Sequence, residues 1–327
     1  HKELLEDIGE KELIKRLAEF MPKNQISDDC AFIKTNNKEL LINTDSLVEN
    51  VHFNNETISP LDIGWKAVAS NVSDLISSGC SKIIGVNIGL VVPPKTDWNW
   101  IKDLYIGINR ALEHFGGSIL GGDCSVGKEK VISMTIIGTQ GELKLRRNSC
   151  RPKEIIMTTG IHGLSKLGLM IKSKKTFDDN FYLAQTLIDR SIQQFCNPKL
   201  RPKFLKKLQN ARPNKSFKTI GCTDSSDGLF QSLLDLSIES NCKAIIDYRK
   251  LPKHKNWPQG KEWDKYYFFG GEDYELVFSL PRKWAKNLKN IDNSISEIGF
   301  FAEGYPSVEF KNLKNDEFLK YKSFSHF

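Results

Sequence analysis

The sequence predicts an α/β (α+β) protein of two domains, each a mixed sheet with helices. Short runs of Val, Ile and Leu with the length of strands alternate with longer segments in which apolar residues recur at helical spacing. A basic, poorly patterned segment at residues 141–154 interrupts this alternation, which then resumes. A chain of 327 residues is long enough for two cores. We therefore expect one domain at residues 1–145 and a second at residues 146–327.

Before the boundary, residues 2–21 combine charged and apolar positions at helical spacing and predict a surface helix. The apolar run at residues 83–92 is about half as long as a membrane-spanning helix requires, so we interpret it as a buried strand. Further strands are expected at residues 31–34, 39–44, 118–120 and 131–139, and helices at residues 61–79 and 97–115.

After the boundary, strands are expected at residues 154–160, 218–221, 243–248, 274–280 and 296–300, and helices at residues 164–173, 179–195 and 199–210. The stretch CTDSSDGL at residues 222–229 lies where a strand passes into a helix. An ordinary turn of this kind needs one capping Asp or Ser, whereas this one carries two acids and two serines. The surplus acid is the first indication of a functional site.

Composition excludes several classes of protein. The seven cysteines are scattered singly and form no CxxC pair, which indicates neither a zinc site nor a disulfide framework. The net charge is +7, but the lysines are evenly spread and the aromatic residues do not interleave with them in a patch, so we expect a solvated basic surface rather than a nucleic-acid partner. No apolar segment predicts a membrane span, and no signal segment is recognisable, so we expect a cytoplasmic protein without a membrane partner.

Acidic residues recur in comparable places along the chain, most of them at the predicted ends or starts of apolar strands. They are Asp29, Asp45, Asp74, Asp123, Asp224 and Asp227. Any one of them is readily explained as a turn or helix-cap residue, but the set predicts a shared site. Converging carboxylates raise each other's pKa unless a cation lies among them, and carboxylates with hydroxyls but no His or Cys cluster favour Mg²⁺.

Two features near residue 122 concern phosphate binding. Gly121 and Gly122, next to Asp123, allow backbone N–H groups to approach a phosphate closely. The stretch GDCSVGK at residues 122–128 matches the first seven positions of a P-loop. Glu129 follows it, however, where a hydroxyl is needed, and the next residues predict a strand instead of a helix, so we reject a P-loop.

The chain resembles the thiamine-monophosphate kinase family through five motifs in matching order and spacing, NTDSLVENVHF (43–53), NVSDLISSG (71–79), GGDC (121–124), TDSSDGL (223–229) and GGEDYELVF (270–278). GEKELIKRL (9–17) and YKSFSHF (321–327) are similar to the ends of that family. The resemblance implies the two-domain fold of the aminoimidazole-ribonucleotide synthetase superfamily. The first domain is expected to bind ATP and Mg²⁺ and to form a homodimer, and the second to complete the active site. The implied activity is Mg²⁺-dependent transfer of the γ-phosphoryl group of ATP to thiamine monophosphate.

The resemblance also implies roles for individual residues. The implied Mg²⁺ ligands are Asp29, Thr44, Asp45, Asp74, Asp123, Asp224 and Asp227. The implied ATP contacts are Gly122, Asp123, Arg147 and Ser226, and the implied contacts of thiamine monophosphate are His52, Glu272 and Tyr321. We expect Asp224, Asp227 and Arg147 to act in the transfer itself, while the choice between Arg146 and Arg147 stays open. Because phosphoryl transfer depends on charge neutralisation and alignment, we expect several Mg²⁺ ions and no phosphoenzyme.

The chain departs from the family pattern at Asn43, where a serine is usual, and at Tyr321, where Trp is common. The nearest alternatives are other ATP-dependent enzymes of the superfamily: aminoimidazole-ribonucleotide synthetase, selenophosphate synthetase or a hydrogenase-maturation protein. The first cysteine, Cys30, lies beside an acid pair and not in a glycine-rich loop, which disfavours selenophosphate synthetase. A non-catalytic nucleotide-binding relative is the alternative from a different class, and the complete set of acids disfavours it.

Overall fold

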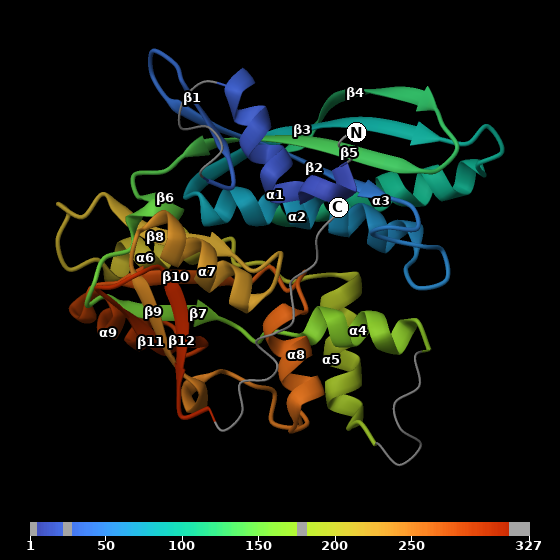
Figure 1. The fold of residues 1–327 in the computed structure, drawn as a ribbon. Coiled ribbons are helices and arrows are strands. Elements are labelled where there is room, and N and C mark those ends of the chain that lie inside the picture. Colours follow the sequence, from blue (N-terminus) through green and yellow to red (C-terminus); the bar gives the residue numbers. More distant parts are fainter. Residues whose placement is uncertain (1–4, 22–27, 175–181, 314–327) are drawn as a thin grey trace.

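The computed structural model describes residues 5–21, 28–174 and 182–313. Within these residues the strands form two sheets, one above the other in Figure 1. The five-stranded sheet has the order β1-β2-β5-β3-β4, and the seven-stranded sheet has the order β12-β9-β11-β7-β10-β8-β6. Both sheets are mixed and both carry helices, so the predicted fold class is confirmed.

The five-stranded sheet comes from the first half of the chain. Its strands are β1 (Ala31–Lys34), β2 (Glu39–Val48), β3 (Cys80–Val92), β4 (Ser118–Val126) and β5 (Val131–Gln140). The helical elements of this half are α1 (Leu5–Leu17), η1 (Ala18–Phe20), α2 (Pro60–Ser77) and α3 (Trp98–Phe115). β3 and β4 are parallel, and the other neighbouring strands are antiparallel. In Figure 1, α2 lies between this sheet and the lower part of the molecule.

The seven-stranded sheet comes from the second half of the chain. Its strands are β6 (Lys144–Arg146), β7 (Ile155–Thr159), β8 (Thr219–Asp224), β9 (Lys243–Asp247), β10 (Leu276–Leu280), β11 (Ile295–Ala302) and β12 (Ser307–Lys311). The helical elements are η2 (Arg147–Ser149), α4 (Leu164–Lys172), α5 (Gln185–Cys196), α6 (Phe204–Ala211), α7 (Leu229–Glu239), η3 (Tyr248–Lys250), α8 (Lys261–Phe269) and α9 (Arg282–Ile291). No described helix combines the length and the hydropathy that crossing a bilayer requires.

Helix α2 begins where its sequence indicates. Ser59 is the N-cap, its side chain accepts a hydrogen bond from the backbone N–H of Asp62, and Pro60 occupies the first turn. Two glycines then let α2 and α3 approach closely. A Cβ at Gly64 would lie 2.1 Å from a backbone oxygen of α3, and a Cβ at Gly107 would lie 1.9 Å from the carbonyl oxygen of Leu61. The crossing of the two helices therefore requires glycine at both positions.

Two strands run further than the sequence predicts. β2 continues to Val48 and β4 to Val126, so Asp45 and Asp123 lie inside strands. The predictions that these acids end strands are wrong, because both segments keep pairing with a neighbouring strand past the acid. Asp224 ends β8 as predicted. Among the described residues, the strands β6 and β12, the α-helices α8 and α9 and the short helical turns η2 and η3 were not predicted from the sequence.

The two halves of the chain meet at α2. Its Trp65 donates a hydrogen bond from Nε1 to the carbonyl oxygen of Pro198 at 3.2 Å. At the start of the same helix, Asp62 Oδ1 accepts a hydrogen bond from Asn197 Nδ2 at 2.5 Å. One hydrophobic cluster includes buried residues of both sheets, such as Ile88 of β3 and Phe278 of β10, together with Val68 of α2. Helix α2 is therefore packed against both halves and is placed to align groups from each.

Candidate active site

Three carboxylates from different parts of the chain converge beside α2. They belong to Asp29 before β1, Asp74 in α2 and Asp224 at the end of β8, and one oxygen of each lies within 4.8 Å of the others. Burial and the charge of Asp29 raise the pKa of Asp224 to about 7. Burial and the charges of the neighbouring acids also raise the pKa of Asp74 well above its ordinary value. We call these three residues the acidic cluster.

One face of α2 holds the acidic cluster in place with hydroxyl groups. Ser73 Oγ donates to Asp224 Oδ2 at 2.5 Å, and Ser77 Oγ donates to Asp29 Oδ2 at 2.8 Å. Residues three or four apart lie on the same helix face, so these serines flank Asp74. Neither serine was predicted as a site residue. Their four-residue spacing, with Asp74 between them in NVSDLISS, could have indicated that they share a helix face close to that acid.

Strand β2 adds Asn43 and Asp45 to the same region. Asn43 Nδ2 donates to Asp74 Oδ2 at 2.5 Å. Burial raises the pKa of Asp45, a hydrogen bond from Ser70 lowers it, and the charge of Asp29 raises it again. Asn43 and Asp45 are two residues apart, so both point to the α2 side of the sheet. The family departure at Asn43 thus places an amide directly on one carboxylate of the cluster.

Thr44 lies between these two residues and faces the opposite side of the sheet, because side chains alternate along a strand. It is exposed, and its hydroxyl lies 2.8 Å from that of Thr135. Its hydroxyl is therefore not brought to the acidic cluster. We call this side of the five-stranded sheet, which α2 and α3 leave uncovered, the open face.

Asp123 and Gly122 lie at the exposed edge strand β4. Packing alone requires a glycine at residue 122, since a Cβ there would lie 2.0 Å from the carbonyl oxygen of Ile88. The register puts Gly122 in the same row as Asp45 but three strands away, which is roughly 14 Å. Asp123, the next residue, pairs through β3 with Ser133 and thus lies on the open face. Within one chain, the structure does not bring it to the acidic cluster.

Arg147, and not Arg146, reaches the acidic cluster. Its guanidinium forms an ion pair with Asp29, and its Nε donates to Thr223 Oγ1 at 3.1 Å. Burial lowers the pKa of Arg147, but the surrounding acids, Asp29 first, raise it further and leave a net increase. The backbone N–H of Arg147 is held by Asp28 Oδ1 at 2.7 Å.

Arg146 points elsewhere. Its guanidinium lies over the ring of Phe32, 3.7 Å from the centroid, and within 3.7 Å of Asp28 and 3.8 Å of Glu39. It also donates to the carbonyl oxygen of Ser78 at 3.1 Å. Packing therefore engages Arg146 at the start of the sheet and brings Arg147 to the cluster, while the contact of either arginine with ATP stays a prediction.

Two other side chains of the turn at residues 223–229, those of Ser226 and Asp227, point in different directions. Ser226 faces Asp224, to which its Oγ and backbone N–H donate at 2.9 Å and 3.3 Å. Asp227 faces the other way, toward Glu10 of α1 and Asp235 of α7. Desolvation, followed by the charges of Asp235 and Glu10, raises the pKa of Asp227 to about 6. Among the described residues, Asp227 is thus near the cluster but not one of its three carboxylates.

The loop at residues 270–278 docks onto this turn. The backbone N–H of Glu272 donates to the carbonyl oxygen of Ser226 at 2.7 Å. The Glu272 carboxylate accepts from Lys66 Nζ at 2.8 Å. His52 lies in the turn after β2, where its Nδ1 accepts from the backbone N–H of Val48 at 3.0 Å. Tyr321 lies outside the described residues.

The other acids of this loop have structural partners that the sequence analysis did not identify. Asp273 accepts from the backbone N–H groups of Gly163 and Ser165 at 2.5 Å and 2.9 Å, at the start of α4, while burial raises its pKa to about 7. Glu275 receives two hydrogen bonds from Arg201, at 2.9 Å and 2.6 Å. The presence of Asp273 and Glu275 in this loop is therefore explained by partners within the protein, without a ligand.

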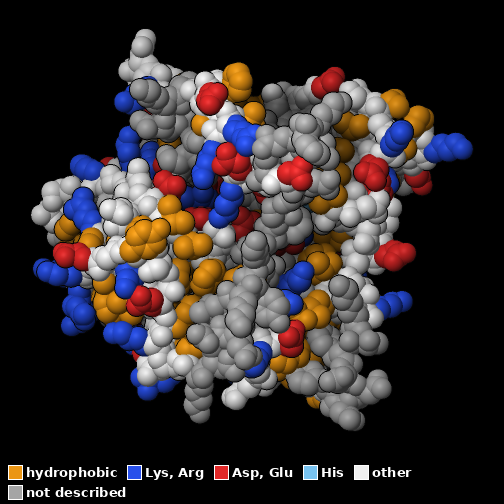
Figure 2. Space-filling view, viewed as in Figure 1, with side chains coloured by type: hydrophobic (Ala, Val, Ile, Leu, Met, Phe, Trp, Pro, Cys, Tyr) orange, Lys and Arg blue, Asp and Glu red, His pale blue; other side chains and the backbone are white. Residues whose placement is uncertain are grey.

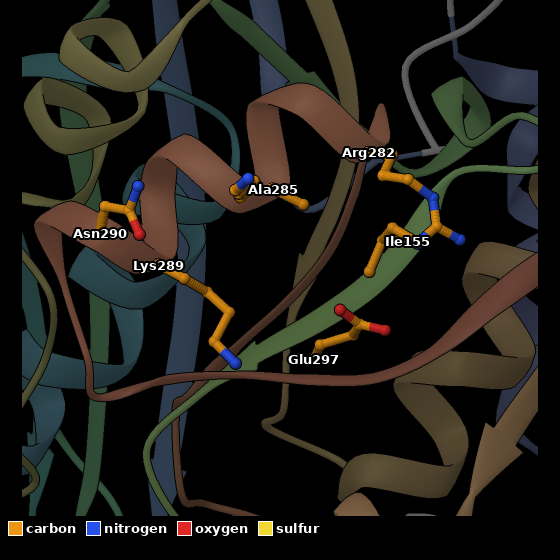
Figure 3. Close-up of a pocket in the computed structure, with 7 residues that line it drawn as sticks. Ile155, Arg282, Ala285, Lys289, Asn290 and Glu297 are labelled. Carbon is orange, nitrogen blue, oxygen red and sulfur yellow. The ribbon is translucent and has the colours of Figure 1, made fainter.

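Figure 2 shows Lys, Arg, Asp and Glu side chains gathered between the upper and lower parts of the molecule. A separate surface pocket of roughly 370 Å³ lies between α9 and β11, lined by Ile155, Arg282, Ala285, Lys286, Lys289, Asn290 and Glu297 (Figure 3). Ile155 pairs with Leu280 at one end of β10, whereas Asp224 pairs with Leu276 at the other. This pocket is thus at the far end of the strands from the acidic cluster.

Comparisons with known proteins identify the family of this chain. Residues 27–140 match the family model described as AIR synthase related protein, N-terminal domain. Over 326 residues the chain is 42% identical to the thiamine-monophosphate kinase of Prochlorococcus marinus. The matched region covers 100% of this chain and 98% of that protein. It is 30% identical to the thiamine-monophosphate kinase of Synechococcus elongatus, with 99% and 98% coverage.

Solved structures give the same result. The structure described as AaThiL complexed with AMPPCP and TMP is 28% identical, with a TM-score of 0.82 and coverage of 100% of this chain and 99% of that one. The thiamine monophosphate kinase from Aquifex aeolicus has a TM-score of 0.77 at 27% identity, with 95% and 98% coverage. The HypE–HypF complex, at 17% identity and a TM-score of 0.71, shares the fold alone. The chain therefore belongs to the thiamine-monophosphate kinase family.

Proposed function

We propose that this protein transfers the γ-phosphoryl group of ATP directly to thiamine monophosphate, giving thiamine diphosphate and ADP. The observation that carries the proposal is the convergence of Asp29, Asp74 and Asp224 from both halves of a chain whose full-length relatives are thiamine-monophosphate kinases. Transfer between two phosphate-bearing substrates brings several negative charges together, so a site for it needs cations and alignment more than a covalent intermediate.

The donor set of the acidic cluster fits Mg²⁺. Its oxygen ligands are carboxylates, and the charge of Asp45 acts on it from β2. Burial first, and then the charges of neighbouring acids, raise the pKa values of Asp74 and Asp224, and a divalent cation would offset the repulsion between these acids. We propose that these residues, with Asp29, hold several Mg²⁺ ions. When bound, the ions would supply positive charge that offsets the negative charge of the substrate phosphates.

The chain's own residues supply orientation. Arg147 lies at the rim of the acidic cluster and presents a planar guanidinium, which suits two-point contact with the phosphates of ATP. Ser226 orients Asp224 through two hydrogen bonds, and we propose that it and Gly122 also contact the nucleotide. Asp227, on the other side of the same turn, is proposed to hold a further cation beside Arg147.

For thiamine monophosphate we propose contacts from Glu272, His52 and Tyr321. Glu272 is held against the turn that carries Asp224, so a substrate touching it lies near the acidic cluster. His52 follows β2, the strand that carries Asp45. An aromatic ring at residue 321 suits stacking on the cationic thiazolium group.

We propose a homodimer formed through the open face of the five-stranded sheet. Strand β4 is exposed along most of its length and its Leu120 is 50% exposed, which is unusual for a sheet and typical of an interaction surface. Thr44 and Asp123, two predicted metal ligands that one chain keeps apart from its acidic cluster, both lie on this face. We propose that Asp123 acts across the interface, in the site of the second copy.

Subunit complementation tests this arrangement. Asp123→Asn and Asp224→Asn are each expected to be inactive. In a mixed dimer, the site that pairs an intact Asp224 with an intact Asp123 from the second chain recovers activity. If Asp123 acts within its own chain, both sites of the mixed dimer lack an acid, and mixing restores nothing. A monomeric protein by light scattering also contradicts the proposal.

We also propose that residues 1–145 and 146–327 are the two functional domains, with the boundary inside β6. A cytoplasmic location is proposed as well, because the substrate ATP is available there and because all seven cysteines are free, as is usual in a reducing compartment.

The activity itself is tested by incubating the protein with ATP, thiamine monophosphate and Mg²⁺ and following thiamine diphosphate. We expect product that depends on Mg²⁺ and on the phosphate of the acceptor. A protein that binds ATP but forms no thiamine diphosphate contradicts the proposal and favours another enzyme of the superfamily. Replacing Mg²⁺ by a chelator is the control for metal dependence.

A further inference from the structure

Lys66 is a cation in an unusual place. It lies in α2 with 1% of its surface exposed, and its ammonium group contacts the carboxylate of Glu272 at 2.8 Å and the ring of Phe195 at 4.6 Å from the centroid. Lysine is rarely buried to this extent, because removing an ammonium group from water is costly even when it is paired. An apolar side chain of similar volume would serve packing at least as well. The charge therefore needs a reason other than packing.

The position of Lys66 links it to the acidic cluster. It lies one helical turn before Ser70 and two turns before Asp74, so the three residues share a face of α2. Ser70 hydrogen-bonds Asp45, and Asp74 belongs to the cluster. The face of α2 that orients the metal-binding acids thus continues to Lys66 and orients Glu272 in the same way.

The two members of the pair differ in their access to solvent. The side chain of Lys66 is 2% exposed and that of Glu272 is 32% exposed. Lys66 therefore lies behind the carboxylate, which it contacts through Oε2, and the other side of Glu272 faces outward. Because the two charges compensate each other, the pair is suited to accept a hydrogen bond of defined direction more than to attract any cation.

The backbone around Glu272 needs such support. Glu272 and Tyr274 have φ values of +57° and +51°, in the left-handed region that non-glycine residues rarely adopt. Such conformations persist only where the surroundings hold them. The backbone N–H of Glu272 is held by Ser226, and its side chain is held by Lys66.

Joining the two halves of the molecule does not account for Lys66. Trp65 and Asp62 already connect α2 to the segment after α5 through hydrogen bonds to Pro198 and from Asn197, without a buried charge. We propose that Lys66 is a positioning residue for thiamine monophosphate: it holds the Glu272 carboxylate where that group accepts a hydrogen bond from the substrate. This inference rests on the proposed function.

Steady-state kinetics with each substrate varied in turn tests the inference. Lys66→Met keeps the length of the side chain and removes the charge. We expect it to raise KM for thiamine monophosphate about tenfold, the usual effect of losing one oriented charged hydrogen bond, while KM for ATP stays within about twofold. Lys66→Arg keeps the charge and is expected to recover most of the loss. Asn197→Ala is the matched control, because it removes a contact between the halves without touching Glu272, and both KM values should stay at the wild-type level.

A double-mutant cycle separates positioning from a merely structural role. If Lys66 acts through Glu272, the double variant Lys66→Met with Glu272→Gln has the same KM for thiamine monophosphate as Glu272→Gln alone. Effects that multiply, or equal increases in KM for both substrates, overturn the inference. If the methionine variant does not fold, the same cycle is run with Lys66→Gln, which also removes the charge and whose effect on KM must vanish in the Glu272→Gln background.

The two levels of proposal fail in different ways. Wild-type turnover together with an unchanged KM for thiamine monophosphate in Lys66→Met overturns the role of Lys66 alone. A wild-type protein that forms no thiamine diphosphate overturns the proposed function and the inference with it.

Discussion

The turn at residues 223–229 and the loop at residues 270–278 are both rich in acids and lie against each other, yet their carboxylates have different surroundings. Each acid of the loop has a partner of its own, namely Lys66 for Glu272, the start of α4 for Asp273 and Arg201 for Glu275. Asp224 of the turn instead faces two other carboxylates. What identifies a cation site is therefore the charge left uncompensated, and not the number of acids.

The contrast is sharpest for the two buried acids Asp224 and Glu275, which are 3% and 4% exposed. Asp224 receives hydrogen bonds from serines, which satisfy its oxygens but leave its charge unmatched. Glu275 receives two hydrogen bonds from the guanidinium of Arg201, which satisfies its oxygens and also matches its charge. We expect the first acid to matter for activity and the second for stability, and the following changes test that division.

The largest effect is expected from Asp224→Asn. An amide keeps the size of the side chain but removes a charge that we propose binds Mg²⁺, and losing one such electrostatic contribution usually lowers turnover by about 10² to 10³. We expect the variant to remain folded, since a repelling charge is removed from the cluster. The rate of thiamine diphosphate formation and a thermal unfolding curve measure the two quantities. Near-normal turnover would exclude Asp224 from the site.

Arg201→Met is expected to act in the opposite way. It leaves the Glu275 carboxylate buried without its countercharge, which costs about 3 kcal/mol of unfolding free energy. Because this pair does not contact the acidic cluster, turnover per folded molecule should change little. Denaturant titration gives the free energy, and the double variant with Glu275→Gln should recover part of it. An unchanged denaturation midpoint would contradict the structural role.

Mg²⁺ is expected to stabilise the protein by a smaller amount. A ligand that binds only the folded state, present at ten times its Kd, adds about 1.4 kcal/mol. Thermal unfolding with and without Mg²⁺ measures this shift. Arg201→Met should respond like the wild type, whereas Asp224→Asn should respond much less. Equal responses in all three proteins would show that Mg²⁺ binds elsewhere.

The smallest effect is expected at Asp292, whose partner Lys207 is 39% exposed. Burial opposes ionisation, but hydrogen bonds from Lys207 and Ser294 lower the pKa of Asp292 to about 2. A lowered pKa contributes stability above the ordinary value, 3.8, which is lost as the pH falls toward 2. For so exposed a pair we expect about 1 kcal/mol. Unfolding of Asp292→Asn and wild type between pH 6 and pH 2 should converge at the acidic end, and a constant difference would contradict the assignment.

Much of the fold was predictable from the sequence. The alternation of strand and helix patterns gave two mixed sheets, and the Ser59–Pro60 step marked the start of α2. The predictions failed where the length of a strand depends on the strands beside it. β2 and β4 continue through Asp45 and Asp123 because neighbouring strands pair with them there. Hydropathy alone indicates an earlier end, since polar residues interrupt the apolar run, Thr44 to Ser46 in β2 and Asp123 in β4, before each strand goes on.

The candidate site was predictable in part. Asp29, Asp74 and Asp224 meet as their pattern suggested. Thr44 and Asp123 do not join them within one chain, because the side on which a strand residue lies depends on the register of the sheet. The serines of α2 were missed since a serine in a helix is usually unremarkable, and only its neighbour across the domain junction gives it a role.

The sequence by itself determined which chemistry is available: a set of carboxylates without a His or Cys cluster, in the order and spacing of a kinase family. Only the tertiary structure decided which charges are matched. It paired Arg146 with the start of the first sheet, brought Arg147 to Asp29 and put Lys66 behind Glu272. The physical reason is that a residue's type is local, whereas the compensation of its charge depends on groups that lie far away in the chain.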